Sequence, residues 1–171
     1  MKALSMDTFT SYQFLSGLRR GPEGDLAFLG AKANVEANSY DRDLWVKPQE
    51  GDAFQLTTDG KTGDFLWDGA HTLLFASSRD PEQKKHQEAG EEYTAFYRLD
   101  LRGGEAKKAF SVPLSASLEE KVGDGRYLLR VDWDLRFSKA YTMKGAAKEE
   151  LLKEKKEEKD YQVLDELPFY F

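Results

Sequence analysis

Few side chains in this sequence have the chemistry of a catalytic or metal site. The only histidines are His71 and His86, and the chain has no cysteine. The missing thiols exclude disulfides, thiolate zinc sites and a cysteine nucleophile. Neither histidine has a partner at the spacing of a metal site or a catalytic triad. We therefore interpret His71 as a residue of a surface turn, and His86 as part of a charged loop beside Lys84 and Lys85.

Two pairs of aspartates at i, i+2 spacing are the next candidates, Asp41 with Asp43 and Asp132 with Asp134. Paired carboxylates can carry out acid–base chemistry or bind a cation. Residues two apart also share one face of a strand, so a solvated strand end produces the same pattern. We favour this second interpretation and expect no catalysis at either pair.

Arg79-Asp80 and Gly103-Gly104 are two further pairs of interest. We expect the first to form an ion pair or to anchor a turn at a strand end, with the lining of a central channel as the alternative. The glycine pair is expected to be a turn, because neither a helix start nor the Lys-Ser/Thr of a phosphate-binding loop follows it.

The tryptophans and one charged run complete the candidates. Three tryptophans are expected to pack between sheets, with ligand stacking as the alternative: Trp45, Trp67 and Trp133. The Lys/Glu run from Lys148 to Lys159 is expected to be the solvated face of a helix, with docking of a partner as the alternative. The sequence therefore assigns no catalytic, cofactor-binding or metal-binding residue.

The elements that position these residues are organised around residues 65–80. Asp68-Gly69 lies between two apolar runs, which predicts a hairpin in which glycine supplies a positive φ. The second strand of this hairpin, Thr72 to Ser77, has a continuous apolar centre from Leu73 to Ala76. A strand that is wet on one face would alternate, so this strand is predicted to be buried on both faces.

The same turn pattern occurs three times, at Gly24, Gly69 and Gly125, which are 45 and 56 residues apart. A period in the forties with several strands per unit is typical of β-propeller blades. Blades stack face to face, so their inner strands are covered on both sides. We therefore predict an all-β fold: a partial β-propeller of about three four-stranded antiparallel blades with one inserted helix.

The predicted blades divide the chain into three units, blade 1 at about 9–58, blade 2 at about 64–112 and blade 3 at about 114–171. In blade 1 the expected strands are 9–15, 26–33, one starting at 44, and 53–57, with a loop at 34–43. In blade 2 they are 65–67, 72–77, 93–101 and 107–112, with an exposed polar loop at 81–92. In blade 3 they are 114–118, 126–133, 160–164 and 168–171, with a helical insert at about 139–159 and an apolar stripe of Met143, Ala147 and Leu151.

Composition limits the partners. The formal net charge of −6 argues against nucleic acid and anionic membranes. No apolar run approaches the roughly 20 residues of a membrane span, and the first ten residues lack the apolar core of a signal peptide. We expect a cytoplasmic protein. Since closed propellers have typically about 4–8 blades, we also expect either a fragment of a longer propeller or a homo-oligomer formed through exposed blade faces.

Several stretches resemble a known repeat. They are Asp43-Leu44-Trp45-Val46, Trp67-Asp68-Gly69 with Leu73-Leu74-Phe75, and Tyr97-Arg98-Leu99-Asp100-Leu101 with Gly103-Gly104-Glu105-Ala106. The pattern resembles the propeller repeat of prolyl oligopeptidase-type serine peptidases, above all the acylaminoacyl-peptidase branch, and is shared with TolB-like propellers. The resemblance implies an N-terminal propeller that filters peptide substrates by size for a following α/β-hydrolase domain, and no cofactor.

No Gly-X-Ser-X-Gly nucleophile motif occurs in this sequence, so no catalytic residue is carried over from the family. The hypothesis is the substrate-gating propeller portion of such a peptidase, inactive alone. The first alternative is a TolB-like propeller that serves as a non-enzymatic protein-binding scaffold. The second is a stand-alone β-sandwich with a helical arm. A hydrolase domain or further blades in the continuing reading frame would separate the first two.

Overall fold

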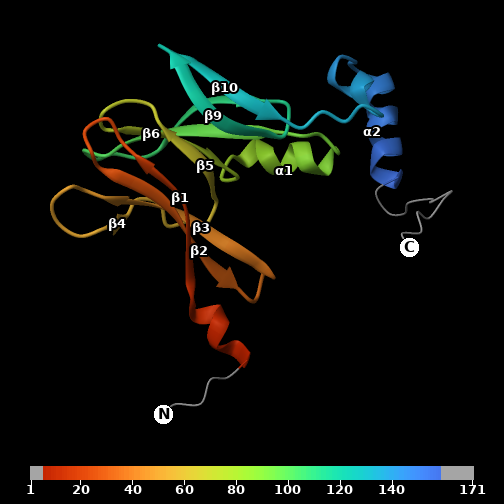
Figure 1. The fold of residues 1–171 in the computed structure, drawn as a ribbon. Helices are drawn as coiled ribbons and strands as arrows, with labels where there is room; N and C mark the ends of the chain where they lie inside the picture. Colours follow the sequence, from red (N-terminus) through yellow and green to blue (C-terminus); the bar gives the residue numbers. More distant parts are fainter. Residues whose placement is uncertain (1–5, 159–171) are drawn as a thin grey trace, which may run out of the picture.

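The computed structural model describes residues 6–158, and its strands form antiparallel β-sheets (Figure 1). The first sheet follows a short 3-10 helix, Met6–Ser11, and has four strands in chain order. These strands are β1 (Gln13–Arg20), β2 (Leu26–Asn34), β3 (Ser39–Lys47) and the short β4 (Phe54–Gln55). Each strand pairs with the next one along the chain, so the sheet is a meander.

The second sheet repeats this arrangement. Its strands, again in chain order, are β5 (Thr62–Trp67), β6 (Thr72–Ser77), β7 (Thr94–Asp100) and β8 (Lys107–Val112). The sequence predicted β6 and β8 with these same bounds. Helix α1 (Pro81–Glu88) connects β6 to β7. The connection occupies the segment expected to be an exposed loop at 81–92, so that expectation was wrong over eight of its residues.

A β-hairpin and two helical segments follow. The hairpin pairs β9 (Ala116–Gly123) with β10 (Arg126–Val131), and a 3-10 helix, Ser138–Tyr141, leads to α2 (Ala146–Glu158). The predicted helical insert is therefore present and shorter than 139–159. The strands predicted at 160–164 and 168–171 lie outside the described residues. No sheet within residues 6–158 closes on itself, and the arrangement as three blades stays a prediction.

The second sheet is covered on both faces. One face packs against the first sheet through a buried cluster that includes Leu73 and Phe75. The other face packs against the β9–β10 hairpin through a cluster that includes Leu74 and Leu118. The side chains of Leu73, Leu74 and Phe75 are each 0% exposed. The continuous apolar run of β6 therefore has the two-sided burial that the sequence predicted.

The hairpin differs from its counterparts in the two larger sheets. β10 is the second strand of its sheet, as β2 and β6 are. Within the described part of the chain only its inner face is covered, by contacts of Tyr127 and Leu129 with the second sheet. Leu128 is 53% exposed and Val131 40% exposed. The expectation that the inner strand of each blade is covered on both sides was therefore wrong for the outer face of β10 within residues 6–158.

Several predicted boundaries also need correction. Phe9 lies in the first 3-10 helix, and the first strand begins at Gln13 instead of residue 9. The loop predicted at 34–43 shrinks to a turn, because β3 already begins at Ser39, after Asn38 with φ of 48°. Gly24 and Gly125 have positive φ and Gly69 does not. The β5–β6 connection is a wider loop closed by a hydrogen bond from the Asp68 N–H to the Thr72 carbonyl, 2.8 Å.

Helix α2 buries a different face from the one predicted. Leu152 and Lys155 are its buried residues, at about 7% exposure each. The stripe of Met143, Ala147 and Leu151 is not the packed face, and Met143 precedes the helix. Within residues 6–158, no helix has both the length and the apolar character needed to span a membrane.

Candidate functional site

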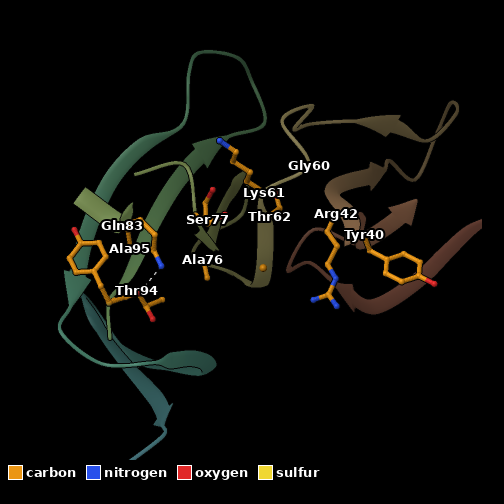
Figure 2. A pocket seen from close by; sticks show the side chains of 13 residues that line it. Tyr40, Arg42, Gly60, Lys61, Thr62, Ala76, Ser77, Gln83, Thr94 and Ala95 are labelled. Atoms are coloured by element: carbon orange, nitrogen blue, oxygen red, sulfur yellow. Dashed lines mark hydrogen bonds between the residues drawn. The ribbon is translucent and has the colours of Figure 1, made fainter. Parts of the chain in front are cut away.

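An open groove of about 380 Å³ lies where the first and second sheets meet (Figure 2). Tyr40 and Arg42 of β3 form one wall. The opposite wall contains Gln83 of α1 and residues 93–95 at the start of β7. Residues 60–63 and the end of β6 close the groove between these walls. Because its volume falls within the roughly 300–1,000 Å³ of ligand pockets and both sheets contribute to its lining, we take this groove as the candidate site.

Backbone hydrogen bonds hold the two sheets together beneath the groove. The Arg42 N–H donates to the Gly60 carbonyl at 3.0 Å, and Arg42 forms a parallel bridge with Lys61. The Ser78 N–H donates to the Lys61 carbonyl at 3.2 Å. The segment that enters β5 therefore joins β3 of one sheet to the end of β6 in the next.

Asp43 fixes the same connection from the other side. Its Oδ1 accepts hydrogen bonds from the Thr57 hydroxyl at 3.1 Å and from the Gly60 N–H at 3.0 Å. Thr57 also accepts from the Leu44 N–H and contacts the Thr62 hydroxyl at 2.8 Å. This network joins two buried threonines to a carboxylate. Asp43 is therefore a structural group, and its prediction as a solvated strand-end residue was wrong.

Asp41, the other member of that predicted pair, has separate partners. Its two carboxylate oxygens accept from the side-chain amide of Asn34 at 3.0 and 3.2 Å. The Asn34 carbonyl oxygen in turn accepts from the Ala37 N–H at 3.1 Å and so stabilises the β2–β3 turn. Asp41 and Asp43 therefore have separate partners and different roles.

Arg79 and Asp80 do not pair with each other. The Arg79 Nε lies 3.2 Å from Asp59 Oδ2, and the guanidinium lies over the rings of Phe75 and Tyr97 at 5.2 and 5.3 Å from their centroids. Asp80 is the N-cap of α1, since its Oδ1 accepts from the Glu82 N–H at 3.0 Å. Asp80 thus anchors the start of a helix, where the prediction was an ion pair with Arg79 or the anchor of a turn.

Asp80 is 5% exposed and its second oxygen is also engaged. Oδ2 lies 2.5 Å from Lys108 Nζ and accepts from the Tyr93 hydroxyl at 3.1 Å. Burial alone raises the pKa of Asp80, but Lys108, the Glu82 N–H and Tyr93 together hold that pKa below its ordinary value. The carboxylate therefore remains charged and ties α1 to β8.

A second buried carboxylate, Asp68, links the second sheet to the β9–β10 hairpin. It accepts from Arg98 Nε at 2.6 Å and from the Tyr127 hydroxyl at 2.7 Å, and lies 3.1 Å from Lys121 Nζ. Burial raises the pKa of Asp68, yet these three donors together hold it below its ordinary value. The sequence indicated only a turn here, because partners at positions 98, 121 and 127 cannot be inferred from local spacing.

Asp64 lies on the same interface, but its pKa is shifted in the opposite direction. Its Oδ2 accepts from the backbone N–H of Leu118 in β9. Among residues 6–158 no cation forms an ion pair with it, and burial outweighs the charge of the nearby Arg19, so the pKa of Asp64 is raised. Neither carboxylate faces the groove of Figure 2.

The two histidines belong to different segments of the chain. His71 belongs to the β5–β6 loop, where its Nε2 lies 3.5 Å from Glu23 Oε2. His86 is on helix α1, not in a loop, with Nδ1 2.5 Å from Glu91 Oε2 and its ring stacked on Tyr93 at 4.4 Å. The described part of the chain contains no cluster of side chains able to hold a metal ion.

Asp132 and Asp134 also have different partners. Asp132 accepts from the Ser115 hydroxyl at 2.8 Å, beside the end of β10. Asp134 Oδ1 accepts from the Arg136 N–H at 3.1 Å, and its Oδ2 lies 3.9 Å from Lys155 Nζ. The pair is therefore divided between the hairpin and α2, and forms no common site.

Helix α2 is held in place by ion pairs. Lys155 Nζ lies 2.9 Å from Glu92 Oε1, and Lys148 pairs with Glu91. Glu92 raises the pKa of the Lys155 ammonium despite its burial. The charged run was predicted as a solvated face, which is wrong for these two lysines. The remaining exposed residues of α2, such as Lys153, fit the prediction.

The tryptophans and the glycine pair complete the set. Trp67 packs between the sheets against Gly21, and its Nε1 donates to the Arg19 carbonyl at 3.3 Å. Trp45 instead stacks on Phe28 of the same sheet, 6.3 Å between centroids, and Trp133 stacks on Tyr141 at 4.3 Å. Inter-sheet packing is thus confirmed for Trp67 alone. Gly103 and Gly104 have φ of 126° and 107° in the β7–β8 turn, as predicted.

Comparisons with known proteins place this fold. No family model matches the chain, and no curated protein matches it. An acylaminoacyl peptidase solved in complex with Z-Gly-Gly-Phe-chloromethyl ketone matches 67% of this chain with a TM-score of 0.51 and 20% identity. The Pyrococcus horikoshii acylaminoacyl peptidase matches 67% of this chain with a TM-score of 0.51 and 19% identity. The chain shares its fold with one part of these peptidases. It spans only 16% of either of them.

Proposed function

We propose that this chain is the N-terminal propeller portion of a serine peptidase of the acylaminoacyl-peptidase or prolyl oligopeptidase type. In this proposal residues 9–58, 64–112 and 114–171 are three successive blades, and residues 139–159 are an insert in the third. The propeller gates the access of peptides to a catalytic α/β-hydrolase domain that these 171 residues do not contain. The observation that carries the proposal is the fold shared with acylaminoacyl peptidases.

The strand order supports the interpretation as blades. Two four-stranded meanders follow each other in the chain, and β9–β10 begins a third unit with the same connectivity. The second sheet is covered on both faces, by the first sheet and by the hairpin. A two-layer β-sandwich leaves one face of each sheet open to solvent, so this arrangement favours radial blades over the sandwich alternative.

The outer sheets present apolar side chains that a neighbouring blade would cover. Leu15 and Leu18 of β1 are 66% and 67% exposed, and Leu128 of β10 is 53% exposed. Single exposed apolar residues are common on protein surfaces, whereas contiguous ones mark interfaces. Further blades would cover the open faces of β1 and of the hairpin, and a second copy of the chain would cover them in a homo-oligomer. Cytoplasmic location and peptide substrates belong to the same proposal.

Labelling of the native protein with a fluorophosphonate probe tests the function. The protein is captured with an antibody raised against residues 6–158 and treated with the probe, which reacts with activated serines. We expect a labelled species much larger than the 19.5 kDa of this chain, and no labelling or peptide hydrolysis by the isolated chain. Absence of labelling from a captured protein that contains only further propeller blades would instead support the scaffold alternative.

A further inference from the structure

The groove of Figure 2 has one cationic wall without a counter-ion. Within residues 6–158, no carboxylate forms an ion pair with Arg42 or Lys61. The nearby acidic side chains are already engaged: Asp41 by Asn34, Asp43 by Thr57 and Gly60, and Asp59 by Arg79. The Arg42 and Lys61 side chains diverge in Figure 2, with Arg42 beside the space between the walls. Arg42 is therefore a free guanidinium at a formed groove.

The opposite wall provides an acceptor without a donor. Gln83 is oriented by its own amide, because Nε2 donates to the Tyr93 carbonyl at 3.0 Å. The other amide atom, Oε1, is buried and has no hydrogen-bond partner within the described residues. A buried acceptor that lacks a donor is costly. A ligand N–H is the group that this atom lacks.

Ser77 adds a donor at the end of β6. Its hydroxyl oxygen accepts from the Arg79 N–H at 3.3 Å and from Arg79 Nε at 3.0 Å. Its own proton is thus available to a ligand oxygen. The neighbouring positions are small: a Cβ built on Gly63 would lie 3.2 Å from the Ala76 Cβ. The groove keeps its open space because glycine and alanine occupy this part of its lining.

We propose that this groove binds a short peptide through the free carboxylate at the peptide's C-terminus. Arg42 holds the carboxylate with its planar fork of donors, and Gln83 Oε1 accepts a peptide N–H. A phosphate group is a poorer fit, because phosphate sites present converging donors or several cations, whereas here the Arg42 and Lys61 side chains diverge and an acceptor lies on the opposite wall. The binding needs no catalytic domain, so it stands apart from the proposed peptidase function.

Binding of N-acetyl-trialanine to the 171-residue chain, followed by ¹H–¹⁵N NMR titration, tests the proposal. The acetyl cap removes the amino-terminal charge, and the matching C-terminal amide is the control ligand. We expect chemical-shift changes at Arg42, Ser77 and the Gln83 side-chain amide. The amide should bind at least about tenfold more weakly than the acid, since a charge-assisted pair is lost.

Variants locate the binding site. R42Q should weaken binding of the acid at least about tenfold, and R42K should weaken it less, because lysine keeps the charge without the fork. Q83L should weaken the acid and the amide by the same factor. R130Q, an exposed arginine of the hairpin that pairs with Glu119 at 3.4 Å, is the control and should change nothing. The spectrum of each variant reports whether it is folded.

Three results would overturn the proposal. One is equal affinity for the acid and the amide, and another is binding of the acid that R42Q leaves unchanged in a folded variant. The third is binding of inorganic phosphate or acetate as tight as that of the peptide, which would make the groove a site for simple anions only. None of these results depends on whether the native protein is a peptidase.

Discussion

Asp64 and Asp68 face the same hairpin from the second sheet, and their carboxylates have opposite electrostatic outcomes. Asp68 has three donors, from Arg98, Lys121 and Tyr127, and its pKa is lowered. Asp64 accepts from backbone N–H groups, that of Leu118 among them, and burial raises its pKa. The fold therefore stabilises the charged form of Asp68, whereas it disfavours the charged form of Asp64.

D68N should lower the free energy of unfolding by about 1–3 kcal/mol at neutral pH, because Arg98 and Lys121 lose the anion that they share. A depressed folded-state pKa stabilises the fold above the unfolded-state value and loses this contribution as pH falls. The difference between wild type and D68N should therefore shrink as pH falls through roughly 5 to 2. Urea unfolding at several pH values measures it, and a difference independent of pH would contradict the role of the charge.

D64N is the matched comparison on the same interface. Asparagine keeps an acceptor for the Leu118 N–H and removes the buried charge. Because the raised pKa of Asp64 makes the fold less stable as pH rises through it, D64N should be as stable as wild type at neutral pH, or more stable. Marked destabilisation by D64N in the same unfolding series would show that the carboxylate charge supports the interface.

At the scale of elements, α1 depends on its N-cap. Asp80 accepts from the Glu82 N–H and binds Lys108 and Tyr93, so D80A removes the cap and leaves a cation without its partner. We expect a loss of about 1–3 kcal/mol in thermal unfolding. D80N retains the capping oxygen and should lose less. Equal losses for the two variants would mean that the ion pair with Lys108 matters more than the cap.

Docking of α2 rests on Lys155 and its pairing with Glu92. K155M keeps the aliphatic packing and removes the charge, which leaves Glu92 without its cation. Amides of residues 146–158 should then exchange hydrogen faster, while those of β6 keep their protection. K153M serves as the control, since the Lys153 side chain is 78% exposed. Unchanged exchange in α2 after K155M would mean that Leu152 and the Lys148–Glu91 ion pair are enough to hold the helix.

These elements also show what the sequence could provide. Strands of the second sheet were predictable because continuous and alternating apolar patterns directly reflect burial. Helix α1 was missed although Asp80-Pro81-Glu82 has the composition of a helix start. The buried face of α2 could not be predicted, because Lys155 is buried by pairing with Glu92, 63 residues away in the chain. The groove was missed for the same reason, since its walls come from separate sheets.

At the scale of the whole molecule, burial is uneven across the three sheets. The second sheet is enclosed and the two outer ones each have an open face. The sequence repeat indicated equal units, but a unit at the end of an array has only one neighbour. The burial of corresponding side chains therefore depends on whether their sheet is central or outermost, and the repeat pattern does not encode that position.

Because of this difference, leucine-to-alanine substitutions in the corresponding strands β6 and β10 should change stability by different amounts. Leu74 of β6 is 0% exposed, so L74A should cost about 2–5 kcal/mol in urea unfolding. Leu128 of β10 is 53% exposed, so L128A should change the unfolding of the monomer by no more than about 0.5 kcal/mol. Sedimentation velocity adds the second measurement. If another copy covers the outer face of the hairpin, L128A weakens that association while the monomer stays folded. A large loss of monomer stability in L128A would mean that other residues of the chain already cover this face. The exposed face from which we infer further blades would then not exist.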